Sequence, residues 1–249
     1  MRIWAIADLH LSKNPSVQKP MDEFGGVWVN HDEKLKENWE SMVAPEDTVI
    51  IPGDISWALR YDEARDDLAW IDALPGNKLL LKGNHDLWWT SLAKMRGRYE
   101  SIEYIQNDAH LRGNVVIFGS RGWMCPGSAN FLEDEDANAK IYRREILRLE
   151  MSIERALVIC EQHEELRGER PVLIGAMHYP PSNGQGEETD FTKLFAQVGA
   201  SCVVYGHLHG GDAFGERILK SSEGVDYHLV SLDRLDCVPK LIYEELKGE

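Results

Sequence analysis

The sequence has few cysteines, and they form no recognisable arrangement. Its 249 residues contain four, namely Cys125, Cys160, Cys202 and Cys237. None belongs to a Cys-x-x-Cys pair, and their spacing matches neither a disulfide framework nor a thiolate zinc site. This usage is typical of a reducing compartment, so we predict a cytoplasmic location.

Long apolar runs and basic runs are also missing. No stretch approaches the roughly 18 apolar residues of a membrane span, and the apolar run from Met1 to Ala7 is too short for a signal peptide. Lys and Arg number 27 against 42 Asp and Glu, which gives a formal net charge of −15. Such a chain repels polynucleotides unless a local basic patch overrides the global field, and no run of Lys and Arg is long enough. We therefore expect neither a membrane protein nor a partner of long nucleic acids.

The sequence lacks internal repeats, low-complexity tracts and linkers that would divide it. Its length and its 43% hydrophobic content suit one large α/β domain over residues 1–249, with two small domains as the alternative. Apolar runs and helical periodicity alternate first, and strand patterns dominate towards the end. The predicted strands are 2–7, 48–51, 79–81, 115–118, 172–176, 201–205, 227–231 and 240–243, and the predicted helices are 32–42, 61–72, 87–98, a long helix after 137, and 189–198.

One tetrapeptide, Gly83-Asn84-His85-Asp86, follows the apolar run Leu79-Leu80-Leu81. The run predicts a short buried strand, and the Gly-Asn pair predicts a sharp turn at its end. Open α/β sheets bind their ligands at the carboxyl ends of strands. At such a position Asn84 offers a neutral oxygen to a metal, and His85 offers a proton near neutral pH. Asp86 can hold His85 in one orientation. Because these are also ordinary turn residues, the tetrapeptide alone does not decide the function.

Other groups of metal-binding side chains also directly follow predicted strands. They are Asp8 with His10, Asp54, His178, and His207 with His209. Five such groups, counting the tetrapeptide, predict convergence at one edge of a sheet. Imidazole, carboxylate and amide ligands suit Mn, Fe, Zn or Co rather than Ca. Seven ligands exceed what one tetrahedral ion accepts, so we expect two ions, with Asp54 as the bridging carboxylate.

The charge of this site favours an anionic substrate. Two divalent ions bring four positive charges, and Asp8 and Asp54 return two negative ones. The positive remainder attracts an anion and a hydroxide, since water bridging two metal ions loses a proton readily. We therefore expect a metal-bridging water or hydroxide that serves as the nucleophile towards a phosphoryl group.

Five motifs between residues 8 and 209 resemble those of the calcineurin-like metallophosphoesterase superfamily, in the family's order. They are Asp8-x-His10, Gly53-Asp54, Gly83-Asn84-His85-Asp86, His178-Tyr179-Pro180-Pro181 and Gly206-His207-Leu208-His209. The resemblance implies an α/β (α+β) fold, a four-layer αββα sandwich in which two mixed β-sheets are flanked by helices.

The resemblance also implies roles for individual residues. One ion would be held by Asp8, His10, Asp54 and His209, and the other by Asp54, Asn84, His178 and His207. His85 would be the general acid for the leaving group. Asp86 would orient His85.

Two departures distinguish this chain from well-studied branches of the superfamily. Protein Ser/Thr phosphatases carry Gly-Asp-x-x-Asp-Arg-Gly and Gly-Asn-His-Glu, whereas this chain has Gly53-Asp54-Ile55-Ser56-Trp57-Ala58 and ends its motif in Asp86. The phosphate-binding Arg of that branch is therefore missing from its usual place. DNA-repair nucleases of the superfamily carry further domains that are absent from this sequence.

Two segments are candidates for substrate selection. The loop of residues 12–30 leaves directly from His10 and carries Lys13, Lys19 and Trp28. Arg121 also follows a predicted strand, where its guanidinium could clamp a phosphate. Simple loop packing accounts for both segments equally well.

The sequence thus predicts a dinuclear metal-dependent phosphoesterase that hydrolyses a phosphate mono- or diester of a small phosphorylated substrate. A nuclease or cyclic-nucleotide phosphodiesterase with the same metals is the alternative among enzymes. A non-catalytic protein-binding scaffold of this fold is less consistent, since the chain keeps all seven ligands and His85.

Overall fold

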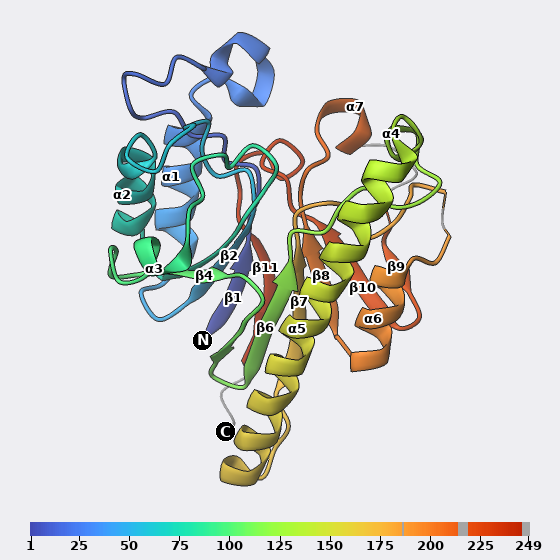
Figure 1. Ribbon diagram of the computed structural model, residues 1–249. Coiled ribbons are helices and arrows are strands. Elements are labelled where there is room, and N and C mark those ends of the chain that lie inside the picture. Colours follow the sequence, from blue (N-terminus) through green and yellow to red (C-terminus); the bar gives the residue numbers. More distant parts are fainter. Residues whose placement is uncertain (186, 214–218, 246–249) are drawn as a thin grey trace. The chain divides into compact units, whose positions relative to one another are not determined.

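The computed structural model describes residues 1–185, 187–213 and 219–245. The chain divides into two compact units, each with its own β-sheet (Figure 1). The first unit comprises Met1–Tyr104 and Val230–Glu249, and the second comprises Ile105–Leu229.

The first unit contains a five-stranded mixed sheet. Its strands are β1 (Arg2–Ala5), β2 (Thr48–Pro52), β3 (Asn77–Leu81), β4 (Ile102–Ile105) and β11 (Lys240–Glu244), in the order β11-β1-β2-β3-β4. β1, β2 and β3 run parallel, and β11 is antiparallel to β1. Every residue of β2 is buried, as expected for a central parallel strand covered on both faces.

Short helices complete the first unit. They are the 3₁₀ turns η1 (Met21–Phe24) and η2 (Gly26–Trp28) and the α-helices α1 (His31–Met42), α2 (Arg65–Ala73) and α3 (Leu92–Met95). Figure 1 shows α1 and α2 beside this sheet, where Leu35 and Trp39 of α1 enter the core. α1 begins at His31 rather than after Asp32, which therefore lies in the first turn instead of capping the helix.

The helix predicted over residues 87–98 is wrong, because only α3 forms within it. Trp88 and Trp89 are both buried, at 1% and 8% exposure. Neighbouring residues on a helix point in different directions, so a helix could not place both rings in the core as readily. Trp88 Nε1 also donates a hydrogen bond to Asp86 Oδ1 over 2.9 Å, which fixes the non-helical turn.

The second unit contains a six-stranded mixed sheet. Its strands are β5 (Ala109–Arg112), β6 (Val115–Ser120), β7 (Val172–Met177), β8 (Cys202–Tyr205), β9 (Ser221–Ser222) and β10 (Val225–Leu229), in the order β5-β6-β7-β8-β10-β9. β6, β7, β8 and β10 are parallel, and β5 and β9 pair antiparallel at the edges. The carboxyl ends of β6, β7 and β8 therefore lie along one edge.

Helices of very different length accompany this sheet. They are α4 (Ala129–Leu132), α5 (Glu135–Arg167), α6 (Asp190–Val198) and α7 (Gly210–Ala213). α5 packs along β5 and β6 and buries Tyr142, Leu149, Ala156 and Cys160, which recur on one face. The Asp134 side chain caps α5 by accepting a hydrogen bond from the Ala137 amide.

The predicted fold class is confirmed, since two mixed β-sheets flanked by helices are present. The prediction of one domain over residues 1–249 stays a prediction. Strands β4, β5 and β9 were not predicted from the sequence, because β4 and β5 are short and mix polar with apolar residues, and β9 consists of two serines. Within the described ranges, no helix has the apolar stretch that a bilayer crossing requires.

Candidate metal centre

The first unit gathers three of the predicted ligands beyond the parallel strands β1 and β2. Past these strands the two chain segments remain hydrogen-bonded to each other. The amide of Asp8 donates to Gly53 O over 2.9 Å, and the amide of His10 donates to Asp54 O over 3.0 Å. This pairing places His10 Nε2 4.0 Å from Asp54 Oδ2. All three candidate side chains are buried, with exposures of 0% for Asp8, 4% for His10 and 2% for Asp54.

Left-handed backbone conformations recur at the candidate ligands. Asp8, His10 and Asp54 have φ angles of 61°, 46° and 51°, and His207 in the second unit has a φ of 75°. Such angles are uncommon outside glycine, although Asp and His adopt them more readily than most residues. Four of the nine non-glycine residues with positive φ in the described chain are candidate ligands. Strained backbone of this kind concentrates at functional sites.

Gly83 allows the turn after β3 to approach Asp54 very closely. A Cβ atom at Gly83 would lie 2.1 Å from Asp54 Oδ1 and 2.2 Å from the Asp54 amide nitrogen. The amide of His85 donates to the same carboxylate oxygen over 2.8 Å. The tetrapeptide therefore wraps around Asp54, and only glycine fits its first position.

Asp86 connects the loops that follow β2 and β3. Its Oδ1 accepts hydrogen bonds from the amides of Ile55 (2.9 Å) and Ser56 (3.2 Å) and from Trp88 Nε1 (2.9 Å). Its Oδ2 accepts from the Gly83 amide over 2.7 Å. The side chain is completely buried, and this burial raises the pKa of its carboxyl group while the four donors oppose the rise.

The sequence predicts that Asp86 orients the His85 side chain, but its contacts show that it also holds two loops together. Two of the four hydrogen bonds come from Gly83 and Trp88, which flank His85 in sequence, and the other two come from backbone amides of the segment after β2. Asp86 thus fixes the backbone that carries His85, and the role of orienting the imidazole directly stays a prediction.

Trp57 provides an aromatic support for two candidate histidines. Its ring stacks on His10 with a centroid separation of 4.5 Å and an angle of 20°, and its ring centroid lies 4.5 Å from that of His85. The loop of residues 12–30 reaches the same place, because Lys19 Nζ lies 4.6 Å from the Trp57 ring centroid and Trp28 packs edge-on to His10. Trp57 was not predicted as a site residue, although it lies within the Gly53–Ala58 segment.

Lys13, in the same loop, has a packing role. Its ammonium group pairs with Asp32 and lies 5.3 Å from the Trp70 ring centroid. Its amide donates to Asp67 Oδ1 over 2.7 Å. These contacts favour loop packing over substrate binding for Lys13.

The second unit places two predicted ligands together after the neighbouring parallel strands β7 and β8. His207 Nδ1 lies 3.3 Å from His178 Nε2. His178 is fully buried, whereas His207 and His209 are partly exposed. The Tyr179 ring supports this pair, since its centroid lies 4.3 Å from that of His207. The unit thus presents imidazoles at the carboxyl edge of its sheet, as the sequence predicts.

Arg121 follows β6 at the same edge, but its contacts lie within the unit. Its guanidinium lies 4.8 Å from the Trp123 ring centroid, and its Nη2 lies 3.6 Å from Oε1 of the buried Glu145. Burial lowers the pKa of Arg121 below its ordinary value. Its carbonyl oxygen accepts hydrogen bonds from the amides of His178 and Tyr179. These contacts favour packing, and the phosphate-clamp role stays a prediction.

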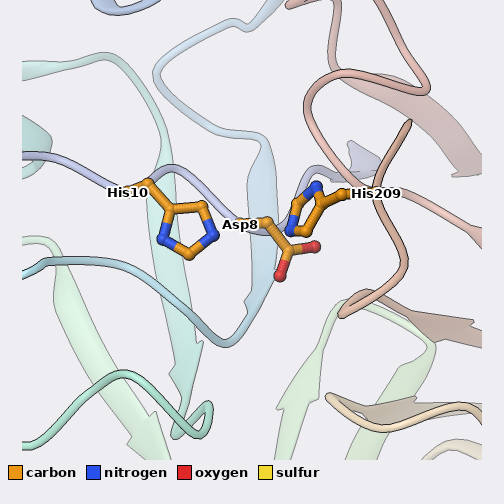
Figure 2. A group of neighbouring side chains, drawn as sticks. All are labelled: Asp8, His10 and His209. Carbon is orange, nitrogen blue, oxygen red and sulfur yellow. The ribbon is translucent and has the colours of Figure 1, made fainter. Parts of the chain in front are cut away.

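The chemistry of the donors fits transition-metal ions. Asp8 and His10 follow β1 and His209 follows β8, and Figure 2 draws these three side chains. Buried carboxylates such as Asp8 and Asp54 are stable when they are paired or bind a metal. Their combination with imidazole nitrogens and the amide oxygen of Asn84 suits Mn, Fe, Zn or Co.

Comparison with known proteins places the chain in a family. A family model described as calcineurin-like phosphoesterase matches residues 1–211. The chain belongs to the calcineurin-like phosphoesterase family. The match contains all five sequence motifs, so the resemblance drawn from them is confirmed. Membership in the calcineurin-like phosphoesterase family implies a dinuclear metal site.

Two phage proteins are similar over part of their length. The Gene 66 protein of Mycobacterium phage L5 is 31% identical over 123 residues, which cover 48% of this chain and 57% of that protein. The Gene 66 protein of Mycobacterium phage D29 is 32% identical over 114 residues, which cover 44% and 55% respectively. The chain spans about half the length of the curated relatives it matches.

Two solved structures resemble this calcineurin-like phosphoesterase over nearly the whole chain. The protein of unknown function AQ665 from Aquifex aeolicus has a TM-score of 0.47 and 16% identity, with coverage of 96% of this chain and 95% of that one. The phosphopantetheinyl hydrolase PptH from Mycobacterium tuberculosis has a TM-score of 0.49 and 19% identity, with coverage of 98% and 96%.

Proposed function

We propose that this chain is a dinuclear metal-dependent phosphoesterase that hydrolyses a phosphate mono- or diester. The observation that carries the proposal is the placement of carboxylate, amide and imidazole ligands directly after parallel strands in a calcineurin-like phosphoesterase. A small phosphorylated substrate and a cytoplasmic location form part of the same proposal.

The proposed ligand sets follow the family pattern. One ion is assigned to Asp8, His10, Asp54 and His209, and the other to Asp54, Asn84, His178 and His207. Two groups within these sets, Asp8 with His10 and His209 and Asp54 with His178 and His207, each combine one carboxylate with two imidazoles. This composition supports Mn, Fe, Zn or Co as the bound metals.

The protein's own groups have distinct parts in the proposed reaction. When bound, the two ions would activate a bridging water as the nucleophile and polarise the phosphoryl oxygens. We assign to His85 the role of general acid, which donates a proton to the departing alkoxide. The hydrogen bond from its amide to Asp54 and the packing of its ring against Trp57 support this role, because both restrict where the imidazole can lie.

Replacement of His85 by Asn tests the assignment. The variant should keep its metal content, while turnover of an alkyl phosphate falls by about 10²- to 10⁴-fold, the usual contribution of a general acid. An ester with a low-pKa leaving group, such as 4-nitrophenyl phosphate, should lose less, since that group departs without a proton.

The matched control is His163→Asn, at a half-buried histidine of α5 that has no assigned role. It should keep both metal and turnover. Full activity of the Mn-loaded His85→Asn protein on the alkyl phosphate would remove His85 from the mechanism.

The alternatives predict different substrate profiles. 4-Nitrophenyl phosphate and bis(4-nitrophenyl) phosphate share a leaving group, so their kcat/KM values separate a monoesterase from a diesterase. A non-catalytic scaffold would show no metal after purification without chelator and no turnover of either ester after addition of Mn.

A further inference from the structure

The second unit contains a cavity of about 220 Å³ beside the candidate ligand His207. Its walls are formed by residues of the loop after β6, of the loop after β7, and of β8 and the segment that follows β8. The apolar and aromatic residues that line it include Met124, Tyr179, Pro180, Tyr205, Leu208 and Leu219. The cavity therefore combines a largely apolar interior with direct access to a proposed metal ligand.

The charge of the lining disfavours an anionic group inside the cavity, in addition to the phosphate at the metal site. Among the described residues that line the cavity there is no Lys or Arg, and Asp212 contributes a carboxylate. An anion in this cavity would lose hydration without a cationic partner and would face the Asp212 charge. The cavity thus favours an uncharged occupant.

Two polar side chains of the lining, Asn183 and Tyr205, are already hydrogen-bonded to other protein groups. Asn183 Nδ2 donates to Pro126 O over 3.2 Å and to Glu187 Oε2 over 2.6 Å. The Tyr205 hydroxyl donates to Leu219 O over 3.2 Å. These groups hold the walls together, so an occupant meets mainly apolar surface.

An aromatic stack forms the wall next to the ligand. The Tyr179 ring centroid lies 4.3 Å from that of His207 and 4.9 Å from that of Trp123, which packs against it. Tyr179 is 5% exposed, so its ring is held in place by its neighbours. A planar group in the cavity would contact this ring while the phosphate to which it is bonded lies towards His207.

We propose that the cavity binds the leaving group of the phosphoester, and that this leaving group is uncharged and ring-bearing. The proposal rests on the proposed function, because it takes His207 as a metal ligand. Pockets for drug-sized ligands occupy roughly 300–1,000 Å³, so this smaller cavity accepts a group of one or two rings. The enzyme therefore selects phosphoesters of neutral ring-bearing alcohols over substrates with a second phosphate on the leaving group.

Filling the cavity tests its role. Met124→Trp introduces a large ring from one wall, and kcat/KM is measured with Mn on 1-naphthyl phosphate and on methyl phosphate. The ratio of the two values should fall by about 10-fold or more, as expected when an apolar pocket loses room for part of its ligand. The control is Met151→Trp, the same substitution at a half-exposed site on α5 outside the lining.

Equal ratios in the Met124→Trp and Met151→Trp proteins would overturn the proposal. Binding of 1-naphthol, measured by calorimetry, gives a readout that needs no turnover. The wild-type protein should bind it, and Met124→Trp should weaken that binding by a similar factor. If no ester is hydrolysed but naphthol binds in this pattern, the proposed function fails and the cavity assignment stands. Absence of naphthol binding to the wild type would overturn the cavity assignment itself.

The charge preference has a separate test. 4-Acetylphenyl phosphate and 4-carboxyphenyl phosphate have leaving groups of similar size, one neutral and one anionic. The wild-type enzyme should favour the neutral ester by about 10-fold in kcat/KM, a factor equivalent to 1.4 kcal/mol, and Asp212→Asn should reduce this preference. Equal kcat/KM values for the two esters in the wild type would refute the exclusion of anionic leaving groups.

Discussion

Replacement of Asp86 by Asn should destabilise the protein even without metal. The Asp86 carboxylate faces four donors and is completely buried. If the Asn oxygen takes the place of Oδ1, three of these hydrogen bonds persist. The amide NH₂ then replaces Oδ2 and faces the Gly83 amide, so two donors oppose each other.

The size of the effect follows from this lost contact. A hydrogen bond to a charged group contributes about 1.5–3 kcal/mol, and a buried donor left without a partner costs about 1–3 kcal/mol more. Removal of the buried charge offsets part of this cost, since burial raises the pKa of Asp86, so we expect the free energy of unfolding to fall by about 1–3 kcal/mol. Metal affinity should fall too, because the loops that carry Asp54 and Asn84 would no longer be tied together.

Urea denaturation at pH 7 in the presence of EDTA measures the stability of the metal-free protein. Asp66→Asn is the matched control, since Asp66 is exposed on α2 and hydrogen-bonds only to the Asn14 side chain among the contacts described for it. This control should change the free energy of unfolding by less than about 0.5 kcal/mol. If Asp86→Asn also changed it by so little while kcat fell, the reasoning would be refuted, and Asp86 would serve only to orient His85.

Two further substitutions probe the core of the first unit. Gly83→Ala should lower the free energy of unfolding by about 1–3 kcal/mol, as overpacking does, because the added Cβ would clash with Asp54. The control is Gly211→Ala, where the added Cβ meets open space, and it should be near neutral in the same urea denaturation assay. Burial lowers the pKa of Lys78 to about 8 from its ordinary 10.5, so between these pH values the unfolded chain holds a proton that the native protein has lost. The wild type should therefore gain stability relative to Lys78→Met as pH rises from 8 to 10.5, by up to about 3 kcal/mol. A difference that does not vary with pH would contradict the depressed pKa.

The sequence by itself determined the parallel strands and the positions of the chemical groups at their ends. Runs such as Leu79-Leu80-Leu81 are apolar because central parallel strands are covered on both faces, and Gly53 and Gly83 mark where the chain turns. Both signals are local, since they depend on residues within a few positions of each other. These local signals were therefore enough to predict that Asp54 and Asn84 lie at one edge of the first sheet.

The tertiary structure alone decided the details that depend on distant partners. The left-handed angles of Asp8 and His10 are maintained where their amides pair with the segment after β2, about 45 residues away in sequence. The segment of residues 87–98 follows a helical pattern, but burial of Trp88 and Trp89 and the bond to Asp86 outweigh that propensity. The cavity beside His207 is likewise formed by segments that meet only in the folded unit. Backbone strain, buried hydrogen bonds and cavity shape arise from contacts between distant segments, and a local pattern does not encode them.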